Sequence, residues 1–269
     1  MFKKITCKQC GEMYDEAFSE CPNCHAINES LDHNFKTTQM ISWPKQIGLF
    51  AVGLGGFELL ALIISNILIA TGLVDKNVGL ANMLLNTLSY AILFLSLLAI
   101  TNNSLPKLLK SFKKLEPYIA GILCCLFIIL TGSIYSMILK LAGVNIINND
   151  NQQAIDSSSN SFPALSFIIF GFIGPICEEL TYRVGLFSFS KRISKWLAYP
   201  VTIVAFALIH FNFRASSLAN ESLNLPYYIL AGFALTFTYD KFGFAGSTIA
   251  HVLNNVISLI PVSVALGVF

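Results

Sequence analysis

Charged residues are scarce in this chain of 269 residues. Asp, Glu, Lys and Arg together make up 12% of it, whereas hydrophobic residues make up 55%. A soluble domain carries about 25% charged residues, so the deficit indicates a protein built into a membrane. The net charge of +2 is also too small to indicate a nucleic-acid-binding protein, and no nucleic-acid partner is expected.

We expect no secretory signal peptide in the N-terminal segment, because no apolar run precedes Ile47. It carries four cysteines instead, arranged as two Cys-x2-Cys pairs separated by ten residues: Cys7, Cys10, Cys21 and Cys24. This spacing is typical of a tetrahedral structural zinc site. We expect residues 1–30 to form a small zinc-ribbon-like module that holds Zn²⁺, with Gly11 and Pro22 in its tight turns, and residues 31–45 to be a linker.

Two disulfides are the alternative for these four cysteines, but they require an oxidising compartment. Zinc is favoured because the topology below places this end of the chain in the cytoplasm. His25 follows Cys24 directly and could compete as a ligand, although four cysteines already complete the shell. The other three cysteines lie in apolar segments, where we expect buried free thiols: Cys124, Cys125 and Cys177.

Long apolar runs follow the linker, and about 20 helical residues cross the hydrocarbon core. We therefore expect an all-α membrane protein in which residues 46–269 form a multi-pass bundle of about 7–8 transmembrane helices. The seven expected spans are 46–72, 80–101, 118–142, 162–190, 196–213, 226–240 and 243–267. The sixth is short, and Gly174-Pro175 can break the fourth into an extra or re-entrant helix. Residues 148–161 are polar, and we expect them to form a mobile loop.

Lysine and arginine are absent from the loop at 143–161 and gather in the loops of the other side. If the spans alternate, that side holds Lys36, Lys45, Lys107, Lys110, Lys113, Lys114, Lys191, Arg192, Lys195 and Lys241. The opposite side holds Lys76, Lys140 and Arg214. Lys and Arg mark cytoplasmic loops. We expect a cell-membrane protein in contact with the lipid bilayer, with its N-terminus in the cytoplasm and its C-terminus outside.

Ionisable residues within the apolar body are few: Glu58, Glu178, Glu179, Arg183, His210 and His251. Such residues at membrane depth mark a functional site by default. Glu179 and Arg183 stand four positions apart on one helix, which predicts a structural ion pair. That pairing leaves Glu178 free for another role.

Depth along the helices supports one shared site. At 1.5 Å per residue from the cytoplasmic ends, Glu178, His210, His251 and Asn255 lie ~12–21 Å into the membrane. They can therefore converge at one level. Glu58 has three interpretations: it lines the same cavity, pairs with Lys or His, or sits protonated in a helix interface. The interface is favoured, because nearby glycines suit close helix packing.

Three motifs follow one another in the membrane spans. They are Glu178-Glu179-x-x-x-Arg183, Phe206-x-x-x-His210 and His251-x-x-x-Asn255. In this order they resemble the motifs of the CPBP (ABI) family, which includes type II CAAX prenyl proteases and bacteriocin-processing or self-immunity proteins. The resemblance covers about residues 160–269. It implies an intramembrane endopeptidase that cleaves a membrane-anchored or lipid-modified peptide.

The resemblance also implies roles for the motif residues. Glu178 would activate a water molecule, and His210 would hold that water or shuttle a proton. His251 and Asn255 would stabilise the oxyanion, while Glu179 and Arg183 would hold the site's first helix. A Zn²⁺ bound by two histidines and a carboxylate remains an alternative. The sequence lacks His-Glu-x-x-His, and the metal-free mechanism is favoured.

Two other functions remain open. The first is a non-proteolytic membrane scaffold or self-immunity protein that binds a protein partner through the zinc ribbon or the helices. The second is a transporter that uses the polar cluster as an ion site. The transporter is the weaker alternative, because no inverted repeat is evident in the sequence.

Overall fold

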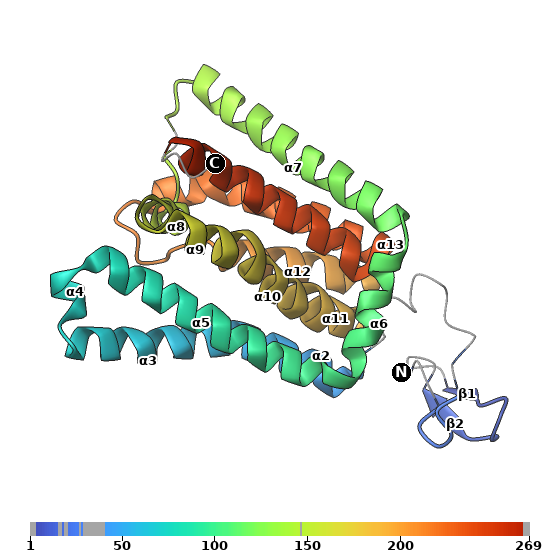
Figure 1. Ribbon diagram of the computed structural model, residues 1–269. Helices are drawn as coiled ribbons and strands as arrows, with labels where there is room; N and C mark the ends of the chain where they lie inside the picture. The colour runs from blue at the N-terminus through green and yellow to red at the C-terminus, as the bar shows by residue number, and fades with distance from the viewer. Residues whose placement is uncertain are drawn as a thin grey trace.

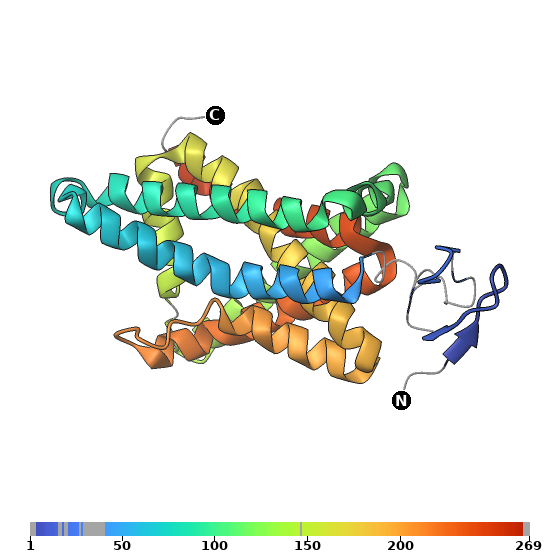
Figure 2. The same ribbon diagram turned by 90° about the horizontal axis from the view of Figure 1, so that it is seen from below.

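The computed structural model describes residues 4–15, 18, 21–26, 28, 41–145 and 147–265. It shows a helical bundle with a small cysteine-bearing module beside one end (Figures 1 and 2). The expected all-α membrane bundle is confirmed. Among the described residues, five stretches are long and apolar enough to cross a membrane: Trp43–Ala70, Val78–Lys113, Glu116–Leu141, Pro163–Ile193 and Leu218–Ile260. The expected linker, 31–45, falls mostly outside the described residues.

The N-terminal module contains one antiparallel hairpin, formed by β1 (Lys4–Thr6) and β2 (Met13–Asp15). Ile5 pairs with Tyr14 in its register. Its small core consists of buried side chains rather than a large apolar surface: Cys7, Tyr14 and Cys21. So few buried groups cannot stabilise a domain of this size without a further cross-link or metal.

The first pass runs through α2 (Trp43–Ala51), the π-helical segment η1 (Val52–Gly56) and α3 (Phe57–Ala70). Gly53 allows this pass to touch the fourth, because a Cβ atom there would lie 1.9 Å from Thr181 Oγ1. The close packing expected from the glycines is therefore confirmed at Gly53. After the short α4 (Leu73–Lys76), α5 (Val78–Thr101) returns alongside α3 (Figure 1).

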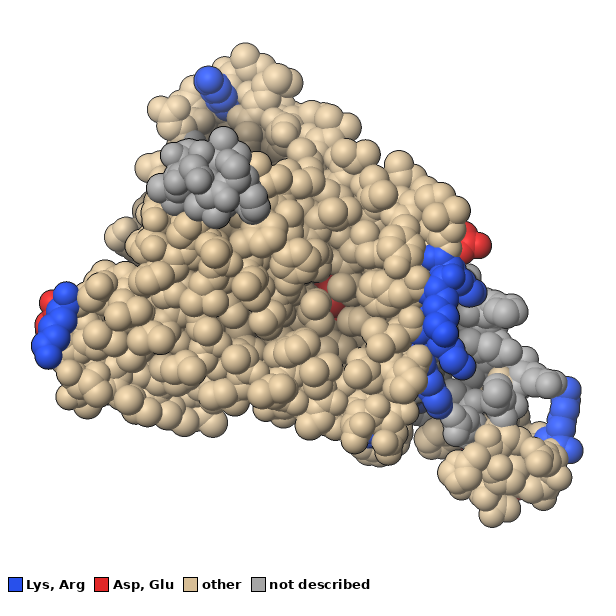
Figure 3. Space-filling model, in the orientation of Figure 1, with Lys and Arg blue, Asp and Glu red and all other residues tan. Residues whose placement is uncertain are grey.

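A lysine-rich connection follows α5 and leads into the third pass. It contains η2 (Asn102–Ser104), α6 (Leu105–Leu109) and η3 (Lys110–Lys113), and α7 (Glu116–Leu141) follows it. Figure 1 places α6 and α11 at the end of the bundle that faces the N-terminal module. Lys and Arg form a band at that end, and the face between the two ends is largely uncharged (Figure 3). This separation of charge suits a bundle that spans a bilayer.

The polar segment before the fourth pass is a helix, α8 (Asp150–Ser161), so the predicted mobile loop is wrong. The Asn149 side chain caps its first turn by accepting a hydrogen bond from the backbone N–H of Gln152. One turn further on, Gln152 donates to Asp156 at 2.9 Å. Local hydrogen bonds of this kind stabilise a helix that has almost no apolar residues.

The fourth pass is the buried centre of the bundle. It comprises α9 (Pro163–Ile168), η4 (Ile169–Ile173), α10 (Gly174–Glu178), η5 (Glu179–Phe187) and α11 (Ser188–Ile193). The helix continues through Gly174-Pro175, so the possible break there is absent. Instead, η4 and η5 are π-helical on either side of α10, and all nine η5 residues are buried. The expected buried thiols Cys124, Cys125 and Cys177 are confirmed.

The last passes are α12 (Lys195–Leu208) and α13 (Leu218–Ala265). Gly243 interrupts α13 with φ 74° and ψ −168°, a conformation that residues with a Cβ atom avoid. Figure 1 shows the chain reversing near the lysine-rich end, so α13 supplies two passes. With α12, this makes seven apolar segments in the part of the chain that the structure describes. The short segment is α12, not 226–240 as predicted, because α13 already begins at Leu218.

Candidate active site

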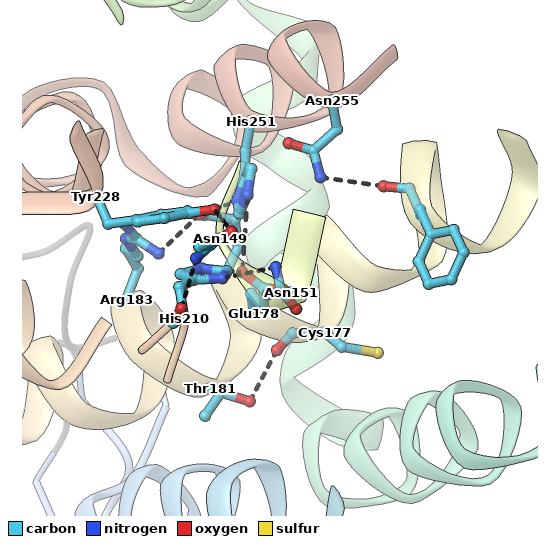
Figure 4. Close-up of polar contacts among 12 residues, drawn as sticks. Asn149, Asn151, Cys177, Glu178, Thr181, Arg183, His210, Tyr228, His251 and Asn255 are labelled. Carbon is cyan, nitrogen blue, oxygen red and sulfur yellow. Dashed lines mark hydrogen bonds and ion pairs between the residues drawn. The ribbon is translucent and has the colours of Figure 1, made fainter. Parts of the chain in front are cut away.

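Glu178 lies between two histidines in the middle of the bundle (Figure 4). Its Oε2 atom is 3.8 Å from His210 Nε2 and 3.7 Å from His251 Nε2. The three side chains come from α10, the end of α12 and the second half of α13. Their convergence, which the sequence predicted from depth, is therefore present in the structure.

Glu179 forms the predicted ion pair with Arg183, at 3.0 Å between Oε1 and Nη1, and both side chains are fully buried. The same Oε1 atom also lies 2.9 Å from His251 Nδ1. Sequence reasoning missed this second contact, because it joins two passes 72 positions apart. Glu179 therefore holds both the central helix and the imidazole that faces Glu178.

The ring of Phe206 contacts both the Arg183 guanidinium and the two histidines. The Arg183 guanidinium stacks over Phe206 at 4.2 Å from the ring centroid. The same ring meets His210 edge-on at 5.1 Å and His251 at 5.8 Å between centroids. Phe206 thus offers its face to the buried cation and its edges to the histidines, which explains why an aromatic residue precedes His210 by one helical turn.

His210 is held by α8 and by the first half of α13. Asn151 Nδ2 lies 3.3 Å from His210 Nδ1, and Asn149 Nδ2 donates to the His210 carbonyl at 2.7 Å. The Tyr228 ring stacks on the imidazole at 4.3 Å, and its hydroxyl donates to Asn149 Oδ1. Sequence reasoning missed all three partners. The cap at Asn149 was the available signal that α8 is ordered.

A cavity of about 270 Å³ opens beside these residues. Glu178, His210, His251 and Asn255 all line it. Asn255 donates from Nδ2 to the Phe170 carbonyl at 3.0 Å, which fixes its amide at the cavity wall. Glu58 lines the same cavity from α3. The favoured interpretation of Glu58 as an interface residue is therefore wrong, and the cavity alternative holds.

The four N-terminal cysteines form a second candidate site. Their sulfur atoms all lie within 4.8 Å of one another, and Sγ–Sγ distances are 3.5 Å for Cys7–Cys24 and Cys10–Cys21. Four sulfurs bound to a tetrahedral Zn²⁺ lie about 3.8 Å apart. All four thiols are free, so the cluster could bind a metal ion.

The two Cys-x2-Cys turns have the same backbone pattern. The N–H of Gly11 donates to the Cys7 carbonyl, and that of His25 donates to the Cys21 carbonyl. Both Gly11 (φ 77°) and His25 (φ 58°) adopt left-handed backbone conformations. His25, rather than Pro22, is thus the counterpart of Gly11. Hydrogen bonds from the backbone of Cys10 and Gln9 lower the pKa of Cys7 to about 6, which favours the thiolate form that metals bind.

Comparisons with known proteins agree with the motifs. Residues 160–257 match the protein-family model described as type II CAAX prenyl endopeptidase Rce1-like. An uncharacterized protein of Mycoplasma capricolum subsp. capricolum is 23% identical over 197 residues, which cover 69% of this chain and 56% of that protein. No solved structure matches the chain. Over the segment that holds all three motifs, the chain is therefore similar to type II CAAX prenyl endopeptidases of the Rce1-like family, as the sequence predicted.

Proposed function

We propose that this protein is an intramembrane endopeptidase that cleaves a membrane-anchored or lipid-modified peptide by attack of a water molecule activated by Glu178. One observation carries the proposal. The buried Glu178 Oε2 atom has no hydrogen-bond partner among the described residues, yet it borders the cavity between two imidazoles. An acceptor left unsatisfied at membrane depth costs free energy and is retained for a functional reason.

In the proposed reaction, Glu178 takes a proton from water as the water oxygen attacks the scissile carbonyl carbon. The carbonyl oxygen becomes an oxyanion, which His251 and Asn255 stabilise. Asn255 has a second amide hydrogen for this purpose, because only one is used by the Phe170 carbonyl. When the intermediate collapses, the C–N bond breaks and Glu178 returns its proton to the leaving amine.

The partners of the two histidines fit these roles. Glu179 accepts a hydrogen bond from His251 Nδ1, which turns the other ring nitrogen, Nε2, toward Glu178 and the cavity. Asn151 donates to His210 Nδ1, which leaves the ring proton of a neutral His210 on Nε2, facing Glu178. His210 can then hold the attacking water by donating to it.

We further propose that this chemistry is metal-free. Within the described residues, the group of ligand atoms close enough together to hold a metal ion is the cysteine cluster, not the cavity group. A zinc mechanism predicts that a strong chelator abolishes cleavage and that added Zn²⁺ restores it. The glutamate mechanism predicts that cleavage survives chelation.

The proposal is tested by cleavage of candidate membrane peptides with purified protein in detergent. Wild-type protein is compared with Glu178→Ala and His251→Ala variants. We expect both variants to lose cleavage by a factor of roughly 10² or more. Equal cleavage by all three proteins would rule out the assigned roles.

The cysteine module suggests a separate activity for the N-terminal region. We propose that Cys7, Cys10, Cys21 and Cys24 bind a structural Zn²⁺ and that the ribbon contacts a protein partner at the cytoplasmic face. Its place at the lysine-rich end of the bundle supports this orientation (Figure 3). If Glu178→Gln kept full cellular function while loss of the ribbon cysteines abolished it, a non-proteolytic scaffold or self-immunity protein would replace the protease.

A further inference from the structure

Glu58 is a second carboxylate on the cavity wall. It belongs to the first pass, far from the three motifs in the sequence, but it lies at a similar depth in the bundle. It lies near the middle of the first span, Trp43–Ala70, as Glu178 lies near the middle of Pro163–Ile193. Both side chains line the same cavity. The matched family segment, 160–257, supplies Glu178 and does not include Glu58.

Local structure brings Glu58 to this position. Contact between Gly53 and Thr181 presses the first pass against η5. Leu54 of the π-helical segment η1 lines the cavity, and so do Phe57 and Glu58 in the turn that follows Gly56. Tyr90 and Asn86 of α5 line the cavity beside them. The first two passes therefore form one wall of the cavity, and the motif residues lie along other parts of its lining.

The charge of Glu58 has no counterpart in the part of the chain that the structure describes. Three other carboxylates of the bundle have partners: Glu179, Asp240 and Glu221. Glu179 contacts Arg183, and Asp240 contacts Lys191 and Lys195. Glu221 accepts from two backbone N–H groups.

For Glu58, no cation and no hydrogen-bond donor is in contact within the described residues, and its side chain is exposed. An unpaired charge at this depth is costly, so a partner from outside the chain is favoured.

We propose that Glu58 is a binding subsite for a positively charged side chain, lysine or arginine, of the peptide substrate. The inference rests on the proposed protease function and adds a substrate class to it. Glu178 is poorly suited to bind a substrate cation itself, since its Oε2 atom already faces two imidazoles. Glu58 is exposed to the cavity without such neighbours. A cavity of about 270 Å³ takes a short extended stretch of peptide, and a cation on that stretch would pair with Glu58.

The test uses full-length protein in liposomes and one family of membrane-anchored peptides. A single lysine, glutamine or glutamate is placed at each position around the cleavage site in turn. For wild-type protein, we expect the best lysine peptide to exceed its glutamine counterpart about tenfold in kcat/KM, the ratio given by one ion pair of about 1.4 kcal/mol. In Glu58→Gln the ratio falls to about one, and in Glu58→Lys the glutamate peptide becomes the best.

Controls separate recognition from folding. Glu116→Gln makes the same chemical change at an exposed position at the start of α7, and it should keep the lysine preference. Thermal unfolding in detergent should show that Glu58→Gln is at least as stable as wild type, because an uncompensated charge is removed. Peptide binding to Glu178→Gln, measured by fluorescence anisotropy, gives the same lysine-to-glutamine ratio without any need for cleavage.

The outcomes are distinct. Cleavage without a lysine preference, or a preference that survives Glu58→Gln, overturns the subsite and leaves the protease intact. A loss of equal size for every peptide in Glu58→Gln assigns Glu58 to the chemistry and also overturns the subsite. If wild-type protein cleaves no peptide but binds lysine peptides through Glu58, the protease function fails while the cation site stands. Absence of both cleavage and selective binding overturns both proposals.

Discussion

Two clusters of charged side chains connect the central pass, Pro163–Ile193, to the last passes, and they differ in how completely their polar atoms are satisfied. Near the lysine-rich end, Asp240 contacts Lys191 and Lys195 and accepts a hydrogen bond from Tyr199 at 2.9 Å. We call this the Asp240 cluster. Halfway through the bundle lies the mid-membrane cluster, which consists of Glu178, Glu179, Arg183, His210 and His251.

The mid-membrane cluster keeps several polar atoms without aligned partners. Glu178 Oε2, Glu179 Oε2 and the Arg183 guanidinium nitrogens have no hydrogen bond with good geometry among the described residues. The Arg183–Glu179 contact is thus an ion pair by distance rather than an aligned hydrogen bond. Unsatisfied groups are most costly where the dielectric is lowest. On this basis we propose a structural role for the Asp240 cluster and a chemical role for the mid-membrane cluster.

The largest expected effect is the loss of activity when Glu178 is neutralised. Glu178→Gln removes the general base while keeping the size of the side chain, so we expect kcat/KM to fall by roughly 10²–10⁴-fold. Stability in thermal unfolding should change little, since Glu178 forms no ion pair shorter than 3.7 Å. Asp240→Asn is the matched control and should show the reverse: lower stability with cleavage by the folded fraction retained. Loss of activity in both variants would contradict the assignment of different roles to the two clusters.

The next largest effect is expected at Glu179. Glu179→Gln leaves Arg183 buried without its counter-charge, and breaking a buried pair in this way costs about 3–5 kcal/mol. Chemical or thermal unfolding in detergent measures the loss. The double variant Glu179→Gln/Arg183→Met should recover part of it, because no lone charge remains. A change of less than about 1 kcal/mol in the single variant would show that the pair is not a structural element.

Removing the contact between α8 and His210 should have a smaller effect, and this effect should be confined to the mid-membrane cluster. Asn151→Leu removes the donor to His210 Nδ1, and we expect about a tenfold loss in kcat, comparable to one hydrogen bond. Nitrogen NMR of labelled histidines should show a shift of His210 from the Nε2–H tautomer. Gln153→Leu changes an exposed amide of the same helix and should leave both readouts near wild type. An unchanged tautomer in Asn151→Leu would contradict the assignment.

The smallest effect on either cluster should come from the cysteine module. Cys21→Ser should abolish metal binding, measured as zinc content, while the unfolding midpoint of the helical bundle stays unchanged. In wild-type protein, metal affinity should fall as the pH drops, because protons compete with the metal for the four thiolates. A coupled loss of bundle stability would show that the ribbon is part of the membrane fold.

The sequence predicted features that depend on one helix at a time. Apolar runs located seven segments, and spacing identified the Glu179–Arg183 pair and the depth shared by Glu178, His210 and His251. Contacts between distant passes could not be predicted in the same way. The Glu179–His251 contact depends on how α13 packs, and the reversal at Gly243 depends on a single left-handed residue. The order of α8 was missed because its polar composition outweighed the cap at Asn149.

The contact between Gly53 and Thr181 has a consequence for how such proteins diversify. It joins the segment that carries the three motifs to a first pass that lies outside the matched family segment. Under the two proposals made above, the chemistry and the choice of substrate lie in separate stretches of the chain. Replacements confined to the leading helices would then change the substrate and leave the reaction centre as it is.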